Sequence, residues 1–259
     1  MNLKVLKKME RFFWLEAFIL KTQIIGELHR QVVLFSAELG LFNAIAHGAQ
    51  KITGKLHSLT ESFIHGRFFI YHQPQKDSNK IKDVVVLKNY PSLRQSLSKF
   101  YTANLFAEIV LASFGGGAAK QEIYQLYQES FEQLEIISEG KTGYLVLQFI
   151  LRFLEKSGHP FELESCALCQ RALTEKEALY YLRPQGVFVC KSCAGDFRQV
   201  FTPGARAYFH KTIHMDLATA MAVSLSQASL AEFKALCYCY LQDQLGTKLN
   251  TLSLGKDLL

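Results

Sequence analysis

Apolar and polar residues alternate along the first third of the chain, in short runs rich in β-branched and aromatic side chains. Gly, Asn, Asp, Ser or Pro residues separate the runs, which is the pattern of short strands joined by turns. The five runs cover residues 15–22, 28–35, 39–46, 60–72 and 82–88. They predict a small β-barrel, in which Gly40 is free to adopt a positive φ at a tight turn. The stretch 48–59 lacks alternation and predicts a mobile loop.

Beyond Pro91 the apolar residues recur with a period of about 3.6, which predicts helices. The pattern indicates helices near residues 93–109, 123–134, 144–154, 205–225 and 230–245. Three consecutive glycines, Gly115 to Gly117, separate the first helix from the second. We therefore expect an α+β protein, with a strand-rich domain over residues 1–90 and an all-α helical bundle over residues 91–259.

Two pairs of cysteines interrupt the helical pattern, each in CxxC spacing: Cys166 with Cys169, and Cys190 with Cys193. Two cysteines three positions apart on a tight turn can both direct their sulfur atoms at one tetrahedral ion. Between the pairs, the short runs 178–182 and 187–189 indicate two strands joined by a turn. The spacing predicts an inserted zinc-ribbon-like module at about residues 162–197, in which four thiolates hold structural Zn²⁺.

Four thiolates fill the coordination shell of zinc, so the metal would stabilise the fold rather than activate water. Buried free thiols or disulfides are the alternative, although a reducing cytosol would preserve thiolates. A redox CxxC needs only one motif, and no thioredoxin-like βαβ pattern surrounds either pair. Cys237 and Cys239 lie two positions apart in a helical stretch and cannot share a face, so we expect them in the core.

The basic excess of the chain lies in its first third. Residues 1–90 contain 13 Lys and Arg against 7 Asp and Glu, whereas residues 91–259 contain 16 of each. This asymmetry favours a small domain that faces a polyanion, with a solvated basic face as the alternative. With 259 residues, 49% of them apolar, the chain is long enough to bury a core.

No uncharged apolar run of about 18 residues occurs, so we expect no membrane span. Basic residues precede an apolar run that begins at Phe12, as in a secretory signal. Glu16 interrupts that run, however, and no small-residue cleavage site follows. We therefore expect a cytoplasmic protein.

A series of short motifs runs through the chain in a characteristic order. They are 16–20 (EAFIL), Gly26-Glu27, 32–35 (VVLF), 38–41 (ELGL), 46–49 (AHGA) and, shortly before the first cysteine pair, 151–160 (LRFLEKSGHP). Together they resemble the bacterial RecO family over about residues 12–200. The chain departs from the family pattern at Ser36, where Thr is usual, and at Gln170, where relatives often have Gly. The loop after Ala46 also has fewer basic residues than in many relatives.

The resemblance implies an amino-terminal oligonucleotide-binding (OB) barrel that binds single- and double-stranded DNA and anneals complementary strands. It implies a role in DNA repair and homologous recombination, in which the protein helps to load the RecA recombinase on DNA coated by single-strand-binding protein (SSB). A RecR-type protein would be its partner in this RecF pathway, and the helical domain would recognise the acidic, Phe-ended C-terminal tail of SSB. Such a protein would be nucleoid-associated.

An OB barrel holds a single strand with basic groups for the phosphates and aromatic rings for the bases. The expected DNA-binding residues, on the strand face and the loops at its rim, are Lys21, Arg30, His47, Lys51, Lys55 and Arg67. Lys7, Lys8 and Arg11 would extend this track. The candidate stacking rings are Phe42, Phe68 and Tyr71, although about half of such rings point into a barrel. Each basic residue by itself is also consistent with an ordinary surface charge.

A docked peptide tail needs an apolar pocket with a nearby cation. Arg152 and Lys156 lie one helical turn apart after apolar residues and are the candidate cations for such a site. An ordinary amphipathic helix is the alternative interpretation of the same pattern.

Two other functions compete with DNA binding. An enzyme, such as a nuclease with an attached zinc ribbon, is not expected, because the sequence has no paired carboxylates at metal-ligand spacing, no P-loop and no GxSxG motif. An adaptor whose barrel binds protein rather than DNA stays open, because the loop after Gly48 is poor in lysine.

Overall fold

The computed structural model describes residues 11–183, 185–196 and 199–255. The chain divides into two compact units, one of residues 1–95 with 106–125 and the other of residues 96–105 with 126–259. The first unit therefore includes a helical segment that lies beyond the strand-rich region.

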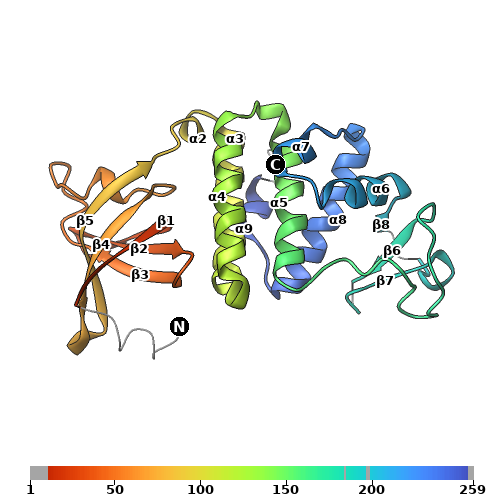
Figure 1. Cartoon of the computed structure of the whole chain (residues 1–259), viewed down its shortest axis with the longest axis horizontal. Helices are drawn as coiled ribbons and strands as arrows, with labels where there is room; N and C mark the ends of the chain where they lie inside the picture. The colour runs from red at the N-terminus through yellow and green to blue at the C-terminus, as the bar shows by residue number, and fades with distance from the viewer. Residues whose placement is uncertain (1–10, 184, 197–198, 256–259) are drawn as a thin grey trace. The chain divides into compact units, whose positions relative to one another are not determined.

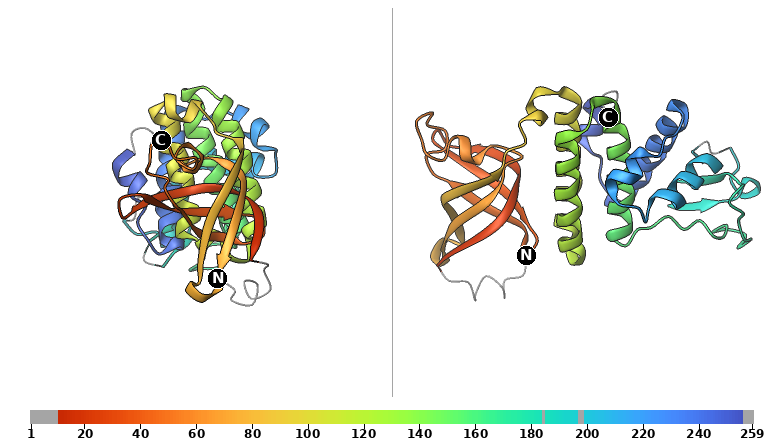
Figure 2. Two further views of the ribbon diagram at one scale, coloured as in Figure 1. Left: turned by 90° about the vertical axis from the view of Figure 1, so that its left-hand side faces the viewer. Right: turned by 45° about the horizontal axis from the view of Figure 1, so that its top comes forward.

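Five strands close a barrel in the first unit, in the order β1-β2-β3-β5-β4 (Figures 1 and 2). They are β1 (Phe12–Ile25), β2 (His29–Ser36), β3 (Gly40–Ala46), β4 (His65–Gln73) and β5 (Ser78–Lys88). The long strand β1 pairs with β4 through its first half and with β2 through its second half. A parallel contact between β3 and β5 completes the closure. The predicted five-stranded barrel is confirmed.

Alternate side chains of the strands fill the interior of the barrel, because successive residues of a strand point to opposite faces. The core includes Leu15, Ala17, Ile19, Val32, Leu34, Phe42, Ala44, Ile64, Phe68, Ile70, Ile81 and Val84. Gly40 has a φ of +70° at the turn into β3, as predicted. Phe42 and Phe68 are at most 1% exposed. The prediction that these two rings stack on bases is therefore wrong.

The connection between β3 and β4 contains turns and a short 3₁₀ helix, η1 (Ser58–Thr60), and no strand. Arg30 in β2 organises it: its Nη1 donates hydrogen bonds to the carbonyl oxygens of His57 and Thr60, at 3.1 and 3.0 Å. The guanidinium of Arg30 thus holds the connection against the barrel by binding two of its carbonyl groups.

The helical segment of the first unit covers one outer patch of the barrel. Tyr124 in α4 (Lys120–Ile136) packs its ring 5.7 Å from that of Phe18 and 5.5 Å from that of Phe35. Its hydroxyl lies 3.1 Å from Nε2 of His65. Between α3 (Leu97–Ala112) and α4 lies η3 (Phe114–Ala119), whose three glycines all have positive φ, as their predicted role as a helix break requires.

The second unit is mainly helical. Its helices after α4 are α5 (Thr142–Lys156), α6 (Pro203–Thr212), α7 (Leu217–Ala222), α8 (Gln227–Leu245) and α9 (Asn250–Gly255), and α5 packs against α7 and α8. No helix in the described part of the chain combines the length and apolarity needed to cross a bilayer.

The prediction of one helix over residues 205–225 is wrong, because the chain forms α6 and α7 there. Asp216 begins α7 as its N-cap and accepts a hydrogen bond from the backbone N–H of Thr219 at 2.9 Å. The backbone carbonyl groups between the two helices are bound by Arg152, whose guanidinium donates to the carbonyl oxygens of Thr212, Ile213 and Met215.

A small sheet interrupts the helices, as predicted. It has the order β7-β6-β8 and consists of β6 (Leu179–Leu182), β7 (Val187–Val189) and β8 (Val200–Phe201). The sequence pattern indicated the hairpin of β6 and β7 but not β8, which is only two residues long.

Candidate metal centre and nucleic-acid surface

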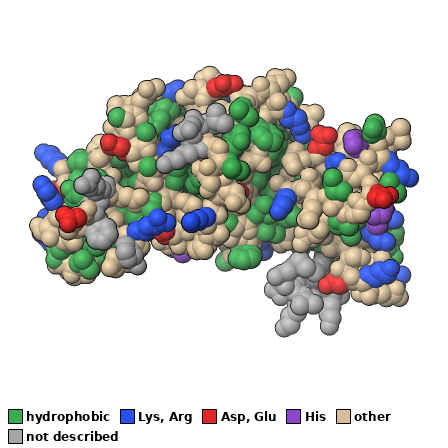
Figure 3. Space-filling model, turned by 180° about the vertical axis from the view of Figure 1, so that it is seen from behind, with side chains coloured by type: hydrophobic (Ala, Val, Ile, Leu, Met, Phe, Trp, Pro, Cys, Tyr) green, Lys and Arg blue, Asp and Glu red, His purple; other side chains and the backbone are tan. Residues whose placement is uncertain are grey.

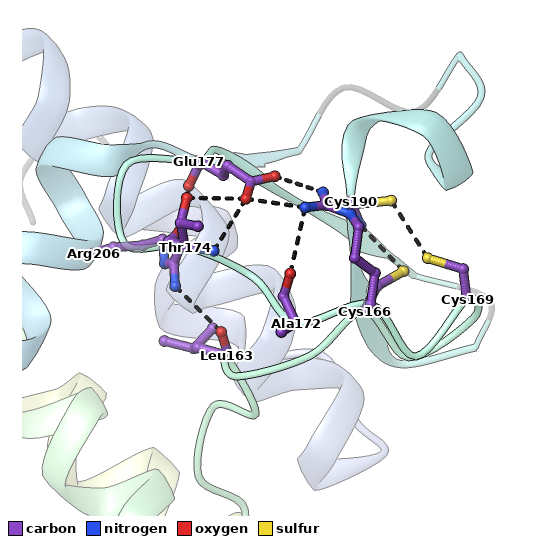
Figure 4. A network of polar contacts seen from close by, with 9 residues as sticks. Leu163, Cys166, Cys169, Ala172, Thr174, Glu177, Cys190 and Arg206 are labelled. Carbon is purple, nitrogen blue, oxygen red and sulfur yellow. Dashed lines mark hydrogen bonds and ion pairs between the residues drawn. The ribbon is translucent and has the colours of Figure 1, made fainter.

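The four cysteines of the two CxxC motifs converge on one point. The sulfur atoms of Cys166, Cys169, Cys190 and Cys193 all lie within 4.8 Å of one another. The sulfur atoms of Cys169 and Cys190 are 3.8 Å apart, and Figure 4 shows them turned toward that of Cys166. A tetrahedral zinc ion with bonds of about 2.3 Å sets its ligand sulfurs about 3.8 Å apart. The four-thiol cluster therefore fits a tetrahedral metal ion.

Two tight turns present these sulfur atoms. In the first, the backbone N–H of Gln170 donates to the carbonyl oxygen of Cys166 at 2.8 Å. Gln170 has a φ of +57°, a left-handed conformation that glycine adopts without strain. In the second turn, the N–H of Cys193 donates to the carbonyl oxygen of Cys190 at 3.0 Å, and Gly195 has the positive φ.

The turns also stabilise the thiolate form of Cys166. Burial raises the pKa of the Cys166 thiol, but hydrogen bonds from the backbone N–H groups of Cys169, Cys190 and Leu168 outweigh it and lower this pKa to about 6. The N–H of Cys190 lies 3.3 Å from the Cys166 sulfur. Such N–H···S contacts favour the deprotonated ligand that a metal requires.

An ion pair lies beside the cluster. The guanidinium of Arg171 donates to both carboxylate oxygens of Glu177, with 3.1 Å between Nη1 and Oε1. The same carboxylate accepts hydrogen bonds from the backbone N–H and hydroxyl of Thr174 at 3.0 and 2.9 Å. The Arg171 hydrogen bonds, followed by those of Thr174, lower the pKa of Glu177 to about 2. The pair thus links the two ends of the segment 171–177, which lies between the first turn and β6.

Two contacts attach the cysteine module to the helices. Arg206 in α6 is 2% exposed, and its guanidinium donates to the carbonyl oxygens of Thr174, Glu177 and Leu163 (Figure 4). On the other side, Asp243 in α8 accepts hydrogen bonds from Tyr181 and Arg183 at 3.0 Å each. Hydrogen bonds of Arg206 and Asp243 thus join the module to α6 and α8.

The predicted DNA-binding residues lie on the barrel in different settings. Lys21 and Lys51 are exposed, whereas Lys55 pairs with Asp83 at 2.8 Å and Arg30 binds loop carbonyls. Arg67 lies over the ring of Trp14, with 4.5 Å from its Cζ to the ring centroid. Arg11 begins the described chain and is exposed, and Lys7 and Lys8 lie outside the described residues.

His47 belongs to a basic cluster that sequence reasoning found only in part. Its ring lies 4.6 Å from that of His29. Burial lowers the pKa of His47, and the positive charges of His29, Lys80 and Lys82 lower it further. Lys80 and Lys82 alternate with apolar residues in β5, which was the available signal. On the barrel face seen in Figure 3, Lys, Arg and His side chains lie among apolar ones.

Exposed aromatic rings were also missed. Phe12 and Trp14 in β1 are 64% and 57% exposed, and Phe69 in β4 is 37% exposed. Each alternates with a core residue, so strand parity separates the two sets of rings but does not say which face is outside. Tyr71, the remaining stacking candidate, is half-buried beside Phe12, with 4.8 Å between the ring centroids.

The expected peptide-binding cations have opposite settings. The guanidinium of Arg152 is buried and bound to three backbone carbonyls, so it is not accessible to a peptide. Lys156, one turn later at the end of α5, is exposed. Arg152 is buried because it binds the backbone carbonyl groups of the connection between α6 and α7.

Both parts of the chain match known families. The family described as Recombination protein O N terminal matches residues 9–90, and the family described as Recombination protein O C terminal matches residues 94–253. The chain belongs to the RecO family.

Relatives of this RecO-family chain carry the name DNA repair protein RecO. The one from Nostoc punctiforme is 29% identical over 64% of the chain and 55% of its own length, so the chain spans little more than half of it. The one from Oceanobacillus iheyensis is 28% identical over 70% of the chain and 67% of its own length. The one from Desulforamulus reducens is 21% identical over 93% of both proteins.

Proposed function

We propose that this RecO-family protein acts in DNA repair and homologous recombination by binding DNA through its barrel. The supporting observation is the cluster of His29, His47, Lys80 and Lys82, in which the ring of His29 and the positive charges of two lysines lie close to His47. A polyanion relieves the mutual repulsion of such a cluster, because its phosphates neutralise the positive charges. In this proposal Lys21, Lys51, Lys55 and Arg67 also contact DNA, and Arg30 positions the loop that carries Lys51 and Lys55.

The reaction we propose needs no catalytic residue. Two complementary strands held with their phosphates neutralised pair when they are brought together, so the protein supplies proximity and charge neutralisation. In this proposal residues 1–90 bind single- and double-stranded DNA and the protein anneals strands without being an enzyme. With a RecR-type partner it helps to load RecA on SSB-coated DNA, in the nucleoid of the bacterial cytoplasm. Residues 91–259 bind the SSB tail, with Lys156 as a candidate cation for that site.

Structural Zn²⁺ is the cofactor in this proposal. It would be held by Cys166, Cys169, Cys190 and Cys193, and it would cross-link the two turns that carry them. Because four thiolates would leave no open coordination position on the metal, the site would stabilise the fold rather than activate water.

The test is fluorescence anisotropy of the full chain with labelled single-stranded and duplex oligonucleotides across a salt series. The logarithm of the affinity should fall by about 0.7 to 0.9 per neutralised phosphate for each unit of log salt. A strand-annealing assay with two complementary labelled strands should show acceleration by the protein. Absence of oligonucleotide binding even at low salt would instead favour a protein-binding adaptor, and any cleavage product with Mg²⁺ or Mn²⁺ would indicate an enzyme.

A further inference from the structure

We propose that the outward face of β1, β4 and β5 is a stacking platform for unpaired bases. The platform is defined by Phe12, Trp14, Phe69 and Tyr71. This inference rests on the proposed function and deepens it, because it assigns single-stranded nucleic acid to a particular face of the barrel.

The four rings form two adjacent rows across two strands. In the antiparallel register Phe12 lies opposite Tyr71, and Trp14 lies opposite Phe69. Directly opposite residues place their Cβ atoms about 5 Å apart, so the rings of both rows share one surface. Two of these rings are more than half exposed, at 64% and 57%. Large rings are usually buried by a fold, and an exposed group of them marks a binding surface.

Cations lie against these rings. The guanidinium of Arg67 is 4.5 Å from the centroid of Trp14, and Nζ of Lys82 is 5.3 Å from the centroid of Tyr71. The nearby carboxylates have partners: Glu16 lies 3.1 Å from His65, and Asp83 lies 2.8 Å from Lys55. The platform therefore presents ring faces and positive charge together.

This combination fits a single strand better than it fits an apolar protein surface. Every base has a flat face that stacks on an aromatic ring, and every nucleotide carries a phosphate that a neighbouring cation neutralises. The platform also continues into the basic cluster, since Lys80 lies opposite Tyr71 in the register and acts on His47. A backbone can thus run from the rings to the rim without leaving the positively charged surface.

Duplex DNA cannot use the platform, because its base faces are already stacked within the helix. The platform would therefore contribute to the binding of single strands only, whereas the basic cluster would contribute to both. The barrel would hold a strand by its bases at one side and by its phosphates at the other.

The sequence supplies a direct probe, because Trp14 is the one tryptophan of the chain. Titration of the full chain with an oligothymidylate should quench its tryptophan emission, and a duplex of equal length should leave the emission unchanged. By anisotropy, Trp14→Ala and Phe69→Ala should each weaken oligothymidylate binding by about 5- to 140-fold and leave duplex binding unchanged. Trp14→Phe should retain most of the affinity. The matched control is Ile24→Ala, which removes a side chain 64% exposed on the same strand and should change neither affinity.

The outcomes separate this inference from the proposed function. If the parent binds single strands but its emission stays constant and both alanine variants bind normally, the platform is wrong and the proposed function stands. Equal losses of affinity for single strands and for duplex in the alanine variants would also overturn the platform. Variants that lose binding to a protein partner but keep their oligonucleotide affinity would overturn it as well. A parent that binds no oligonucleotide at low salt would overturn the proposed function itself.

Discussion

The hydroxyl of Tyr181 in β6 donates a hydrogen bond to the carboxylate of Asp243 in α8, with 3.0 Å between the oxygens. Tyr181 is 1% exposed, so this hydroxyl has exchanged water for a single carboxylate. We expect Asp243→Ala to lower the free energy of unfolding by about 1–3 kcal/mol, because it leaves the buried hydroxyl without its acceptor.

Urea unfolding of the two proteins measures this difference. Arg183→Ala is the control, since it removes another partner of Asp243, and the Arg183 side chain is 59% exposed. It should cost less than about 1 kcal/mol. Equal costs for the two variants would show that the buried hydrogen bond has no special weight.

Removal of one cysteine should release the metal. In Cys166→Ser the zinc content by elemental analysis should fall from about one ion per chain toward zero, and the melting temperature should fall, because metal binding contributes to the free energy of folding. A chelator should lower the melting temperature of the parent but not of the variant. Cys239→Ser is the control, because Cys239 lies outside the four-thiol cluster, and this variant should keep its metal. Equal zinc content in Cys166→Ser and the parent would refute the site.

The left-handed turn at Gln170 should respond to substitution in a defined order. Gln170→Gly removes the strain of a φ of +57° and should raise the free energy of unfolding by about 0.5–1 kcal/mol. Gln170→Val should lower it, because a β-branched side chain tolerates this conformation poorly. Gln170→Ala separates the backbone effect from the loss of the side-chain hydrogen bond to the carbonyl oxygen of Ala167. A valine variant as stable as the glycine variant would contradict this reasoning.

DNA affinity should depend on pH through His47. Its pKa in the folded protein lies below 6.5, lowered by burial and by the charges of His29, Lys80 and Lys82. Without DNA, the unfolded chain therefore binds this proton more readily, and His47 reduces stability as the pH falls from 6.5 through the lowered pKa. A bound phosphate favours the charged ring, so affinity should rise over the same fall in pH.

Anisotropy titrations between about pH 5 and pH 7.5 measure this dependence, which spans the ordinary range of histidine titration. His47→Gln should flatten the rise in affinity. His214→Gln, at an exposed position in the second unit, should leave it intact. Identical pH profiles for the two variants would exclude His47 from the DNA contact.

Local sequence was sufficient where each residue's role depends on its neighbours in the chain. Alternation identified the strands of the barrel, the three glycines after Phe114 marked the break between α3 and α4, and the CxxC spacing identified the four converging thiols. The left-handed conformation of Gln170 agrees with the family resemblance, in which relatives often have Gly at this position.

Cations that bind backbone carbonyl groups show where local sequence was insufficient. Arg30 and Arg152 carry the charge expected of ligand-binding residues, yet each binds backbone carbonyls: those of residues 57 and 60 for Arg30, and of 212, 213 and 215 for Arg152. The acceptors lie 27 to 63 positions away in sequence, so no local pattern contains them.

The sequence by itself determined the barrel of this protein, most of its helical region and its four-thiol cluster, because periodicity and ligand spacing are local properties. Only the tertiary structure decided which side of each strand faces water, and hence that Phe42 and Phe68 are core while Phe12 and Trp14 are surface. It also gathered Lys80 and Lys82 near His47. The physical reason is that exposure and electrostatic neighbourhood depend on closure of the barrel, which brings together strands that are distant in the chain.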